Sequence, residues 1–381
     1  MIEILFVDDD ELILAGQRRM LRANRDEWNI TTRPGGAEGL DYLAENPVDI
    51  VISDMRMPQM DGATFLGRVR ERRPGVIRVI LSGQSDDDST VRAASAAHQF
   101  LSKPCNAEQL KTAIRRGVTA RQRIPHEALR DFVCGLASCP SDQELLRNIK
   151  DCLEADSLTV EQYGELAARD PALVLKVAQL VSTSFFGAPQ HHIHPSQALQ
   201  LFGVDLMRQL ILEENGMVRP AGVAGPTAEF TSVAHDCAQT ATRLAVEYGV
   251  CHPEDAGVAA TIAQLGDCLL AEFAGGMDKS PAADGDSRSP FSTDLATYGL
   301  DRFELAAALA EIWGVPSHIA TTARFIRLPS QCKSPPPTLL PAHMATVLHR
   351  HDVPADYDFL DARQETERFR QLRAANLATA Q

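Results

Sequence analysis

The stretch VISDMRMPQMDG, residues 51–62, decides the fold of the N-terminal part of the chain. Its apolar, β-branched beginning predicts a buried strand that ends at an acid, Asp54. Pro58 and Gly62 then place the following residues in a loop. Open α/β sheets carry their chemistry at the carboxyl ends of their strands, so Asp54 is the first candidate functional residue.

Strand and helix signals alternate on both sides of this stretch, throughout residues 1–122. Short apolar runs predict the strands, and apolar residues at helical spacing predict the segments between them. The predicted strands are residues 2–7, 29–32, 49–53, 76–81 and 99–102, and the predicted helices are residues 11–25, 37–43, 65–72 and 107–121. This alternation predicts an α/β domain with a doubly wound parallel sheet.

Polar side chains follow the predicted strands at the ends that share one edge of a parallel sheet. They are Asp8 and Asp9 after the first strand, Asp54 at the third, Ser82 after the fourth and Lys103 after the fifth. Three converging carboxylates repel one another unless a cation joins them, and oxygen ligands suit Mg²⁺. A nearby lysine would neutralise charge on a transferred phosphoryl group. The set suits an aspartate nucleophile that becomes an acyl phosphate.

Residues 1–122 resemble the receiver domain of two-component response regulators. The motifs that carry the resemblance occur in order: DD after the first strand, D-x-x-MP-x-MDG, a hydroxyl at Ser82, and KP. The resemblance implies a flavodoxin-like fold in which Asp54 is the phospho-acceptor and Ser82 and Lys103 contact the phosphoryl group. The phosphoryl donor would be a sensor histidine kinase or a phosphotransfer protein.

The same resemblance implies a metal site and a switch. Asp8 and Asp9 would form the acidic pocket, and they, Asp54 and the backbone carbonyl of Arg56 would hold Mg²⁺. Phe100, three residues before the lysine, takes the place of the aromatic switch residue. Phosphorylation would then change the contacts of the surface between the fourth and fifth strands, either with the rest of the chain or with a second copy in a homodimer. The sequence departs from the family in the acidic GQSDDDS after the serine and in a cysteine after the KP proline.

The composition of the whole chain narrows the classes of protein and partner. At 381 residues the chain is too long for one ordinary core, so two domains are expected. The net charge of −14 disfavours a non-specific grip on nucleic acid, and no apolar run approaches the roughly 20 residues of a membrane span. The eight cysteines form no C-x-x-C pair and the N-terminus is unlike a signal peptide, which favours a reduced, cytoplasmic setting.

A basic run joins the two halves of the chain. We expect the helix ending in RRGVTARQRIPHE to stop at Pro125 and a linker to occupy residues 123–129. The arginines of the run are Arg115, Arg116, Arg121 and Arg123. Such a run is typical of a solvated face, so we assign it no role in nucleic-acid binding.

Helix signals replace strand signals in the second half. We predict an all-helical domain at residues 130–350 and a C-terminal tail at residues 351–381. Asp170-Pro171 is an acid cap followed by proline, which begins a helix with a clear apolar stripe. A further helix is predicted to start at Pro195-Ser196 and to be interrupted at Gly203. Others are predicted at residues 205–212, 231–248, 253–273, 303–313 and 316–326, with a long loop at residues 275–293.

This half resembles the HDOD family, whose fold is like that of HD-type metal phosphohydrolases without their metal ligands. The resemblance rests on RDPALVLKVAQLVSTSFFG, PSQALQLFGVDLMRQLIL and AATIAQLGDCLL. An HD enzyme would carry His-Asp two or three residues before Gly266, where this chain has Ala263 and Gln264. Neither side chain can replace imidazole and carboxylate at a dinuclear metal. The resemblance implies a non-catalytic output domain that binds a downstream protein partner.

Three alternatives stay open for the second half. His235 matches the first histidine of the HD pattern, so an HD-type metal-dependent phosphohydrolase of cyclic nucleotides, with ligands not yet recognised, is the competing enzyme class. The cluster His191, His192 and His194 could bind a transition metal. A DNA-binding function would need a recognition helix, but DLMRQLILEEN carries one arginine, two glutamates and a mostly apolar face.

Overall fold

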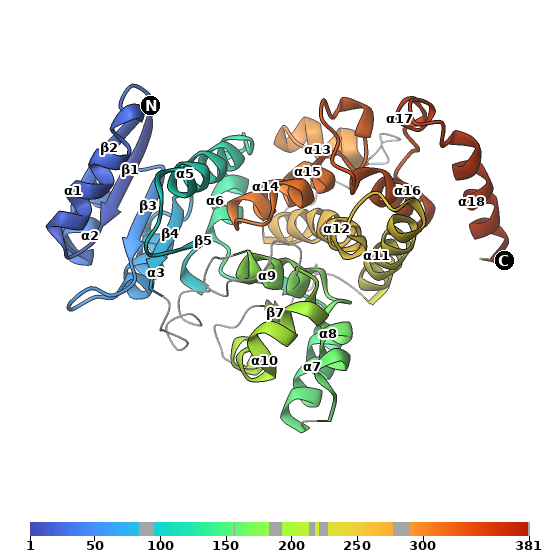
Figure 1. Ribbon diagram of the computed structural model, residues 1–381, viewed down its shortest axis with the longest axis horizontal. Coiled ribbons are helices and arrows are strands. Elements are labelled where there is room, and N and C mark those ends of the chain that lie inside the picture. Colours follow the sequence, from blue (N-terminus) through green and yellow to red (C-terminus); the bar gives the residue numbers. More distant parts are fainter. Residues whose placement is uncertain are drawn as a thin grey trace.

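The computed structural model describes most of the chain. The described residues are 1–83, 95–155, 157–182, 193–212, 218–220, 228–276 and 290–379. A sheet flanked by helices forms one end of the molecule, and helices build the rest (Figure 1). The acidic loop that follows Gly83 lies outside the described residues, as do His191 and His192.

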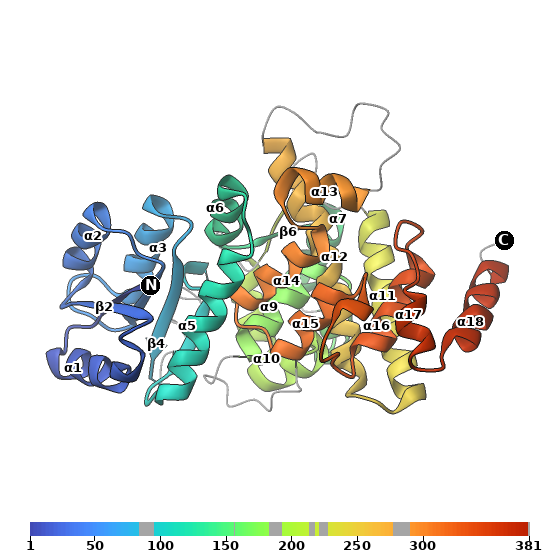
Figure 2. The same ribbon diagram turned by 90° about the horizontal axis from the view of Figure 1, so that it is seen from above.

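The N-terminal part is a parallel sheet of five strands in the order β2-β1-β3-β4-β5. The strands are β1 (Ile2–Val7), β2 (Trp28–Arg33), β3 (Ile50–Asp54), β4 (Ile77–Ser82) and β5 (Gln99–Ser102). The described helices of this part are α1 (Glu11–Met20), α2 (Gly36–Glu45), α3 (Gly62–Arg72) and α5 (Ala107–Gln122), with a 3₁₀ turn at Arg22–Asn24. Helices α2 and α3 cover one face of the sheet, and α1 and α5 cover the other (Figure 2). The predicted doubly wound sheet is confirmed.

Burial explains why the central strands are apolar throughout. Every residue of β3 and β4 is buried, because parallel strands with helices on both faces contact no solvent. The register pairs Asp54 with Leu81 and Ser82 with Ser102, so the strand ends lie at one edge. The fold therefore places the predicted site residues within reach of one another.

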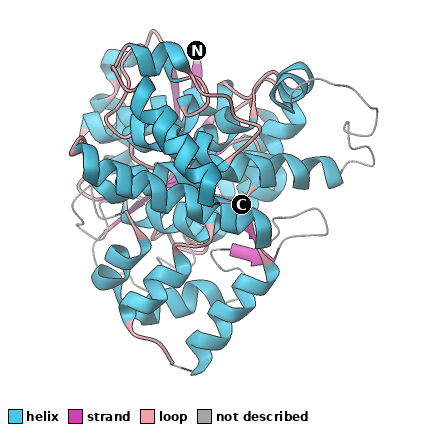
Figure 3. Cartoon of the chain, turned by 90° about the vertical axis from the view of Figure 1, so that its right-hand side faces the viewer, coloured by secondary structure: helices cyan, strands magenta, loops and turns pink. Residues whose placement is uncertain are grey.

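Helices dominate the second part (Figure 3). They are α6 (Glu127–Gly135), α7 (Gln143–Ala155), α8 (Val160–Ala167), α9 (Pro171–Val181), α10 (Pro195–Leu212), α11 (Ala228–Tyr248), α12 (Pro253–Gly276), α13 (Pro290–Tyr298), α14 (Arg302–Ile312), α15 (Ser317–Phe325), α16 (Leu339–His349), α17 (Tyr357–Asp361) and α18 (Thr366–Thr379), with a 3₁₀ turn at Pro329–Gln331. Helix α12 lies at the centre and packs against α9, α11, α14, α15 and α16. Among the described residues, one helix is long and apolar enough to cross a membrane, Pro253–Gly275, and 83% of that window is buried inside the protein.

The second part differs from the prediction in two places. It is not wholly helical, because β6 (Cys139–Ser141) pairs in parallel with β7 (Val218–Pro220). These strands are too short to show a period of two in the sequence. The predicted interruption at Gly203 is confirmed, because its φ of +77° and ψ of 166° are not helical and divide α10 at a kink. Within residues 275–293, α12 reaches Gly276 and α13 begins at Pro290, and the residues between lie outside the described part.

The C-terminal helices pack on the rest of the helical part. Phe369 of α18 is fully buried, and the hydroxyl of Tyr248 donates to Glu365 at 2.7 Å. The guanidinium of Arg368 lies 4.3 Å from the centre of the Tyr248 ring.

The prediction that the basic run before α6 is a solvated face holds for Arg115, which is exposed, and is wrong for the other three arginines. Arg121 donates to the carbonyl of Gly75 and pairs with Asp49 at 2.9 Å. Arg116 and Arg123 reach the helical part, and Ile124 is fully buried. Both views place α5 and α6 between the sheet and helices α9 and α14 (Figures 1 and 2).

Candidate functional site

Three acids meet at the carboxyl edge of the sheet. Asp8 directly follows β1, and Asp54 is the last residue of β3. Asp8 is 2% exposed and Asp54 is 8% exposed, whereas Asp9 is exposed. Each of the three offers a carboxylate oxygen, and these oxygens lie within 4.8 Å of one another. The predicted convergence of the strand-end acids is therefore present in the structure.

Lys103 completes the cluster from the end of β5. Its Nζ lies 2.5 Å from Oδ1 of Asp54 and 3.0 Å from Oδ2 of Asp8. Its backbone N–H donates to the carbonyl of Ser82 at 2.7 Å, which fixes the lysine against the end of β4. The ammonium thus bridges two carboxylates from two different strands.

Burial and pairing shift the pKa values of the two central groups. Burial raises the pKa of Asp54, and the hydrogen bond and charge of Lys103 only partly oppose it. Burial alone would lower the pKa of Lys103, but its hydrogen bonds to Asp54 and Asp8 outweigh burial and raise the pKa. Lys103 is therefore a permanent cation at neutral pH.

The turn after Asp54 depends on a glycine. A Cβ at Gly62 would lie 2.1 Å from the carbonyl oxygen of Asp54, so only glycine lets the start of α3 come this close. The backbone N–H of Gly62 donates to the carbonyl of Met55 at 2.9 Å, and the Asp61 side chain caps α3 by accepting from Thr64. These contacts explain the MDG part of the motif.

The other predicted residues lie near the cluster with different contacts. The backbone N–H of Arg56 donates to Oδ2 of Asp54 at 3.0 Å. The hydroxyl of Ser82 donates to the carbonyl of Gly83 at 3.2 Å. Phe100 is 7% exposed and pairs with Ile80 in the β4–β5 register. It lines a cleft of about 700 Å³ between the sheet and the helical part.

The acid cluster suits a hard divalent cation. Among the described residues, Asp8, Asp9 and Asp54 are the one group of three acidic, histidine or cysteine side chains close enough to share an ion. The donors are all oxygens, which Mg²⁺ prefers. The donor set therefore fits the cation that the sequence predicts.

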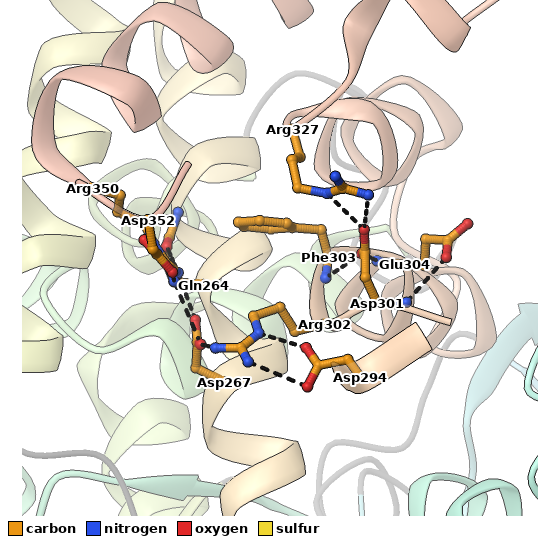
Figure 4. Close-up of polar contacts among 10 residues, drawn as sticks. All are labelled: Gln264, Asp267, Asp294, Asp301, Arg302, Phe303, Glu304, Arg327, Arg350 and Asp352. Carbon is orange, nitrogen blue, oxygen red and sulfur yellow. Dashed lines mark hydrogen bonds and ion pairs between the residues drawn. The ribbon is translucent and has the colours of Figure 1, made fainter. Parts of the chain in front are cut away.

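A different network occupies the position of the HD ligands in the helical part (Figure 4). Gln264 accepts from Nη1 of Arg350 at 2.8 Å, and the same nitrogen lies 2.5 Å from Oδ2 of Asp267. Arg302 pairs with Asp267 through Nη1 and with Asp294 through Nε at 2.7 Å. Two guanidinium groups thus bracket the acid next to the degenerate motif.

Sequence reasoning missed this network because its members are far apart in the chain. One local signal points to it. A Cβ at Gly266 would lie 1.8 Å from the carbonyl oxygen of Arg302, so the glycine of the HD pattern permits the contact between α12 and the start of α14. The glycine was visible in the sequence, but its partner was not.

His235 does not stand alone. It lines a cavity of about 390 Å³ together with His194, Glu165 and Glu254. Burial lowers the pKa of both histidines. Nδ1 of His194 accepts from the backbone N–H of Ser196 at 3.3 Å, so the proton of the neutral ring is on Nε2.

Comparisons with known proteins divide the chain in the same way. A family model of the response regulator receiver domain matches residues 4–115, and a model of the HDOD domain matches residues 139–329. The chain is similar to the hydrogenase transcriptional regulatory protein HoxA of Cupriavidus necator, with 31% identity over 31% of this chain and 24% of that protein. It is similar to the transcriptional regulatory protein GlrR of Escherichia coli, with 35% identity over 29% of this chain and 25% of that protein.

A solved structure is similar to about a third of the chain. It is the signal receiver domain of an HD domain-containing protein from Pseudomonas fluorescens, with 32% identity over 31% of this chain and 87% of that chain, at a TM-score of 0.30. The chain spans about a quarter of the length of the curated relatives named above. Because the HDOD model spans half of the sequence, the chain belongs to the HDOD family, and it carries a response regulator receiver domain ahead of the HDOD domain.

Proposed function

We propose that this chain is a phosphorylation-controlled response regulator of a bacterial-type two-component system. Asp54 accepts a phosphoryl group from a sensor histidine kinase or a phosphotransfer protein, and the HDOD domain is an output that binds a protein partner. The single observation that carries the proposal is the position of Lys103, 2.5 Å from Asp54 and 3.0 Å from Asp8. A cation between a nucleophilic carboxylate and an acidic pocket is what phosphoryl transfer to aspartate requires.

The proposed transfer is a single displacement. A carboxylate oxygen of Asp54 attacks the phosphorus of the donor phosphohistidine, and the new O–P bond forms as the P–N bond breaks. The imidazole nitrogen leaves with the electron pair of that bond. The Lys103 ammonium neutralises charge on the phosphoryl oxygens, and the Ser82 hydroxyl exchanges its bond to Gly83 for one to the phosphoryl group.

Asp8, Asp9, Asp54 and the backbone carbonyl of Arg56 would hold Mg²⁺, which would supply positive charge to stabilise the phosphoryl oxygens during transfer. Asp8 is buried, and its Oδ1 accepts a hydrogen bond from the backbone N–H of Asp10 at 3.0 Å. This hydrogen bond holds the carboxylate in its position in the cluster. Asp9 stays exposed at the mouth of the site.

Helix α1 supports a kinase docking face beside the phospho-acceptor. It begins two residues after Asp9 and leaves Leu12 83% exposed, Ile13 37% exposed and Met20 38% exposed. Ile13, Gly16 and Met20 recur at helical spacing, so they share one face. An exposed apolar face next to a reactive group suits a helical partner that brings its own phosphohistidine.

The HDOD domain is proposed as a binding domain rather than a hydrolase. Arg350 already donates to the side-chain oxygen of Gln264, and two arginines neutralise Asp267. The residues at the position of the HD ligands therefore do not attract a cation. We further propose a cytoplasmic location, no direct contact with membrane, and no direct role for nucleic acid. The proposed domains are residues 1–122 for the receiver, 123–129 for the linker, 130–350 for the HDOD domain and 351–381 for the tail.

The experiment uses the full chain with Mg²⁺ and two reagents. Acetyl phosphate is a small phosphoryl donor, and beryllofluoride is a mimic of the phosphoryl group. The wild type is expected to gain one alkali-labile phosphoryl group and to bind beryllofluoride, and Asp54→Asn is expected to do neither. Equal behaviour of the two proteins would overturn the assignment of Asp54.

A further inference from the structure

We propose that the cleft between the sheet and the helical part binds a small carboxylic acid that has an apolar body and a hydroxyl or N–H group. The cleft measures about 700 Å³, within the range of sites that hold small organic molecules. Residues of β5 and α5 line one side, and residues of α9 and the turn after α14 line the other. The binding of this acid is a property of the resting chain and requires no phosphoryl group on Asp54.

Hydrogen bonds join the two sides of the cleft. Nε2 of Gln179 donates to the carbonyl of His98 at 2.9 Å, and Nε2 of Gln99 donates to the carbonyl of Ile312 at 3.0 Å. Both glutamines are buried, so these bonds are shielded from water. Gly314 has a φ of +76°, and a Cβ there would lie 3.3 Å from the side chain of Gln99. The cleft is therefore a defined feature of the fold, with a glycine where its two sides come closest to Gln99.

Arg116 supplies the charge that points to an acid. Its Nη1 donates to the carbonyl of Gly314 at 3.3 Å. Burial lowers the pKa of this guanidinium, and the charge of Glu311, which already pairs with Arg123, opposes the effect only in part. Among the described residues, no carboxylate forms an ion pair with Arg116. A cation withdrawn from water without such a partner is costly, and a carboxylate that enters the cleft removes this cost.

The free edge of the guanidinium selects a planar oxyanion. Nε and Nη2 of Arg116 are buried and have no hydrogen-bond partner within the described part of the chain. These two nitrogens lie on the same edge of the group, the edge that binds both oxygens of a carboxylate through two parallel hydrogen bonds. A phosphate monoester would bring up to about two negative charges to this single cation, in a chain of net charge −14. The charge balance therefore favours a carboxylate over a phosphate.

Two further groups on the HDOD side define the rest of the ligand. Nε1 of Trp313 and Oε1 of Gln179 are buried and likewise have no partner among the residues that the structure describes. Both side chains are 1% exposed and line the same cleft. The indole N–H can only donate and the amide oxygen can only accept, so the ligand needs an acceptor and a donor. A hydroxyl group supplies both, and an N–H group beside the carboxylate supplies the donor.

The apolar lining of the cleft suits the body of the ligand. It consists of Phe100, Leu101, Val181, Ile193 and Pro316. An aromatic or aliphatic body would remove part of this surface from water. Because the four polar atoms without partners are buried, the side chains around them must shift slightly before a ligand reaches them. Each hydrogen bond that the ligand then makes offsets the cost of this shift, since a buried polar group gains its missing partner.

The probe is 4-hydroxybenzoate, which combines a carboxylate, an aromatic body and a hydroxyl in one small molecule. It is titrated by calorimetry into the full chain, without Mg²⁺ or a phosphoryl donor. Benzoate lacks the hydroxyl, methyl 4-hydroxybenzoate lacks the charge, and phenyl phosphate replaces the carboxylate of benzoate by a phosphate. Arg116→Lys keeps the charge and removes the edge of two nitrogens, and Trp313→Phe removes the indole N–H. Arg115→Lys, at an exposed neighbour, is the matched control.

The wild type is expected to bind one molecule of 4-hydroxybenzoate about 10-fold more tightly than benzoate, and not to bind the methyl ester. Arg116→Lys and Trp313→Phe are each expected to weaken the binding of 4-hydroxybenzoate about 5- to 10-fold. Arg115→Lys is expected to change it less than about 2-fold.

If 4-hydroxybenzoate does not bind the wild type, or if the methyl ester binds equally well, the inference is wrong. Tighter binding of phenyl phosphate than of benzoate would also overturn it, because the site would then select a phosphate. Equal affinities in Arg116→Lys, Arg115→Lys and the wild type would place the acid outside this cleft. The comparison of ligands uses the unchanged protein, so the test stays decisive even where a variant fails to fold.

Discussion

Nζ of Lys103 lies 2.5 Å from Oδ1 of Asp54, and the two residues come from the ends of β5 and β3, two strands that do not pair with each other. The ion pair therefore spans the end of β4, the strand between them. Any change in the charge of Asp54 acts first on Lys103 and through it on β5, which is the strand that contacts the HDOD domain. One ion pair thus connects the reactive carboxylate to the boundary between the domains.

Replacing this lysine tests its chemical role. Lys103→Ala is expected to slow phosphorylation by acetyl phosphate about 100-fold, because the charge that builds on the phosphoryl oxygens loses its nearest cation. The rate is measured with the full chain at saturating Mg²⁺. Lys111→Ala, which removes a lysine from α5 that pairs with Glu108, is the matched control and should leave the rate unchanged. A normal rate in Lys103→Ala would remove the lysine from the mechanism.

Removing the charge of Asp54 should stabilise the receiver. Burial raises the pKa of Asp54, so the stability that the neutral form provides is present below its ordinary pKa of 3.8 and is lost as the pH rises through the raised value. At neutral pH the ionised side chain therefore destabilises the fold. Asp54→Asn in magnesium-free buffer at pH 7 is expected to gain about 1 kcal/mol, equivalent to about 2–8 °C in melting temperature. A melting temperature below that of the wild type would contradict this reading of the site.

The exposed face of α1 can be tested without disturbing the fold. A Cβ at Gly16 would meet no atom within 4 Å, and the same holds for Gly67 of α3, on the opposite face of the sheet. Gly16→Glu is expected to slow transfer from the cognate kinase at least about 10-fold, a cost of about 1.4 kcal/mol, because it places a charge on an apolar contact. Gly67→Glu should transfer normally. Both variants should react with acetyl phosphate as the wild type does. If neither variant slows transfer from the kinase, α1 is not part of the docking face.

The sequence predicts the receiver site well because each of its parts is a local pattern. A short apolar run ended by an acid is visible at Asp54, and the parallel topology then brings the other strand ends to the same edge. Gly62 shows how local the reason is, since its contact is with Asp54 only eight residues away. Where a strand, the turn after it and the residue that the turn contacts all lie within one motif, composition and spacing predict most of the local structure.

The boundary between the domains could not be predicted because its contacts have no local signature. Arg123 and Glu311 are 188 residues apart, and nothing near Arg123 distinguishes a buried ion pair from a solvated basic run. The same applies to Gln99 and Gln179, whose amides bind backbone carbonyls that every residue offers. The strand β6 could not be predicted for a different reason, since a strand of three residues is too short to show an alternation of apolar and polar residues.

The buried lysine of α9 predicts a dependence of stability on pH. Burial lowers the pKa of Lys176 to about 7, and its Nζ lies 4.5 Å from the centre of the Trp313 ring. Its stabilising contribution is present above the ordinary pKa of 10.5 and is lost as the pH falls to about 7. Lys176→Met should therefore exceed the wild type in unfolding free energy by up to about 4 kcal/mol at pH 7, with a difference that shrinks toward pH 10. Lys333→Met, at an exposed position, is the control, and a difference between Lys176→Met and wild type that is constant with pH would contradict the cause.

The arginine network beside the degenerate HD motif should be a structural element of the HDOD domain. Arg350 binds Gln264, Asp267 and Asp352, and these bonds raise the pKa of its guanidinium. Arg350→Met leaves the acids near Gln264 without this cation, and we expect a loss of about 3 kcal/mol in unfolding free energy.

The matched control for the network is Arg370→Met, whose guanidinium is mostly exposed and lies 3.7 Å from Glu367. It should change the unfolding free energy by less than about 0.5 kcal/mol. Asp267→Asn added to Arg350→Met should recover part of the loss, because the acid that lost its partner is then neutral. The measurement is denaturant unfolding of the wild type, the two single variants and the double variant. The prediction is contradicted if Arg350→Met is as stable as the wild type, or if it binds stoichiometric manganese or iron that the wild type does not. Arg350 would then fill the position of a metal ion instead of stabilising the domain.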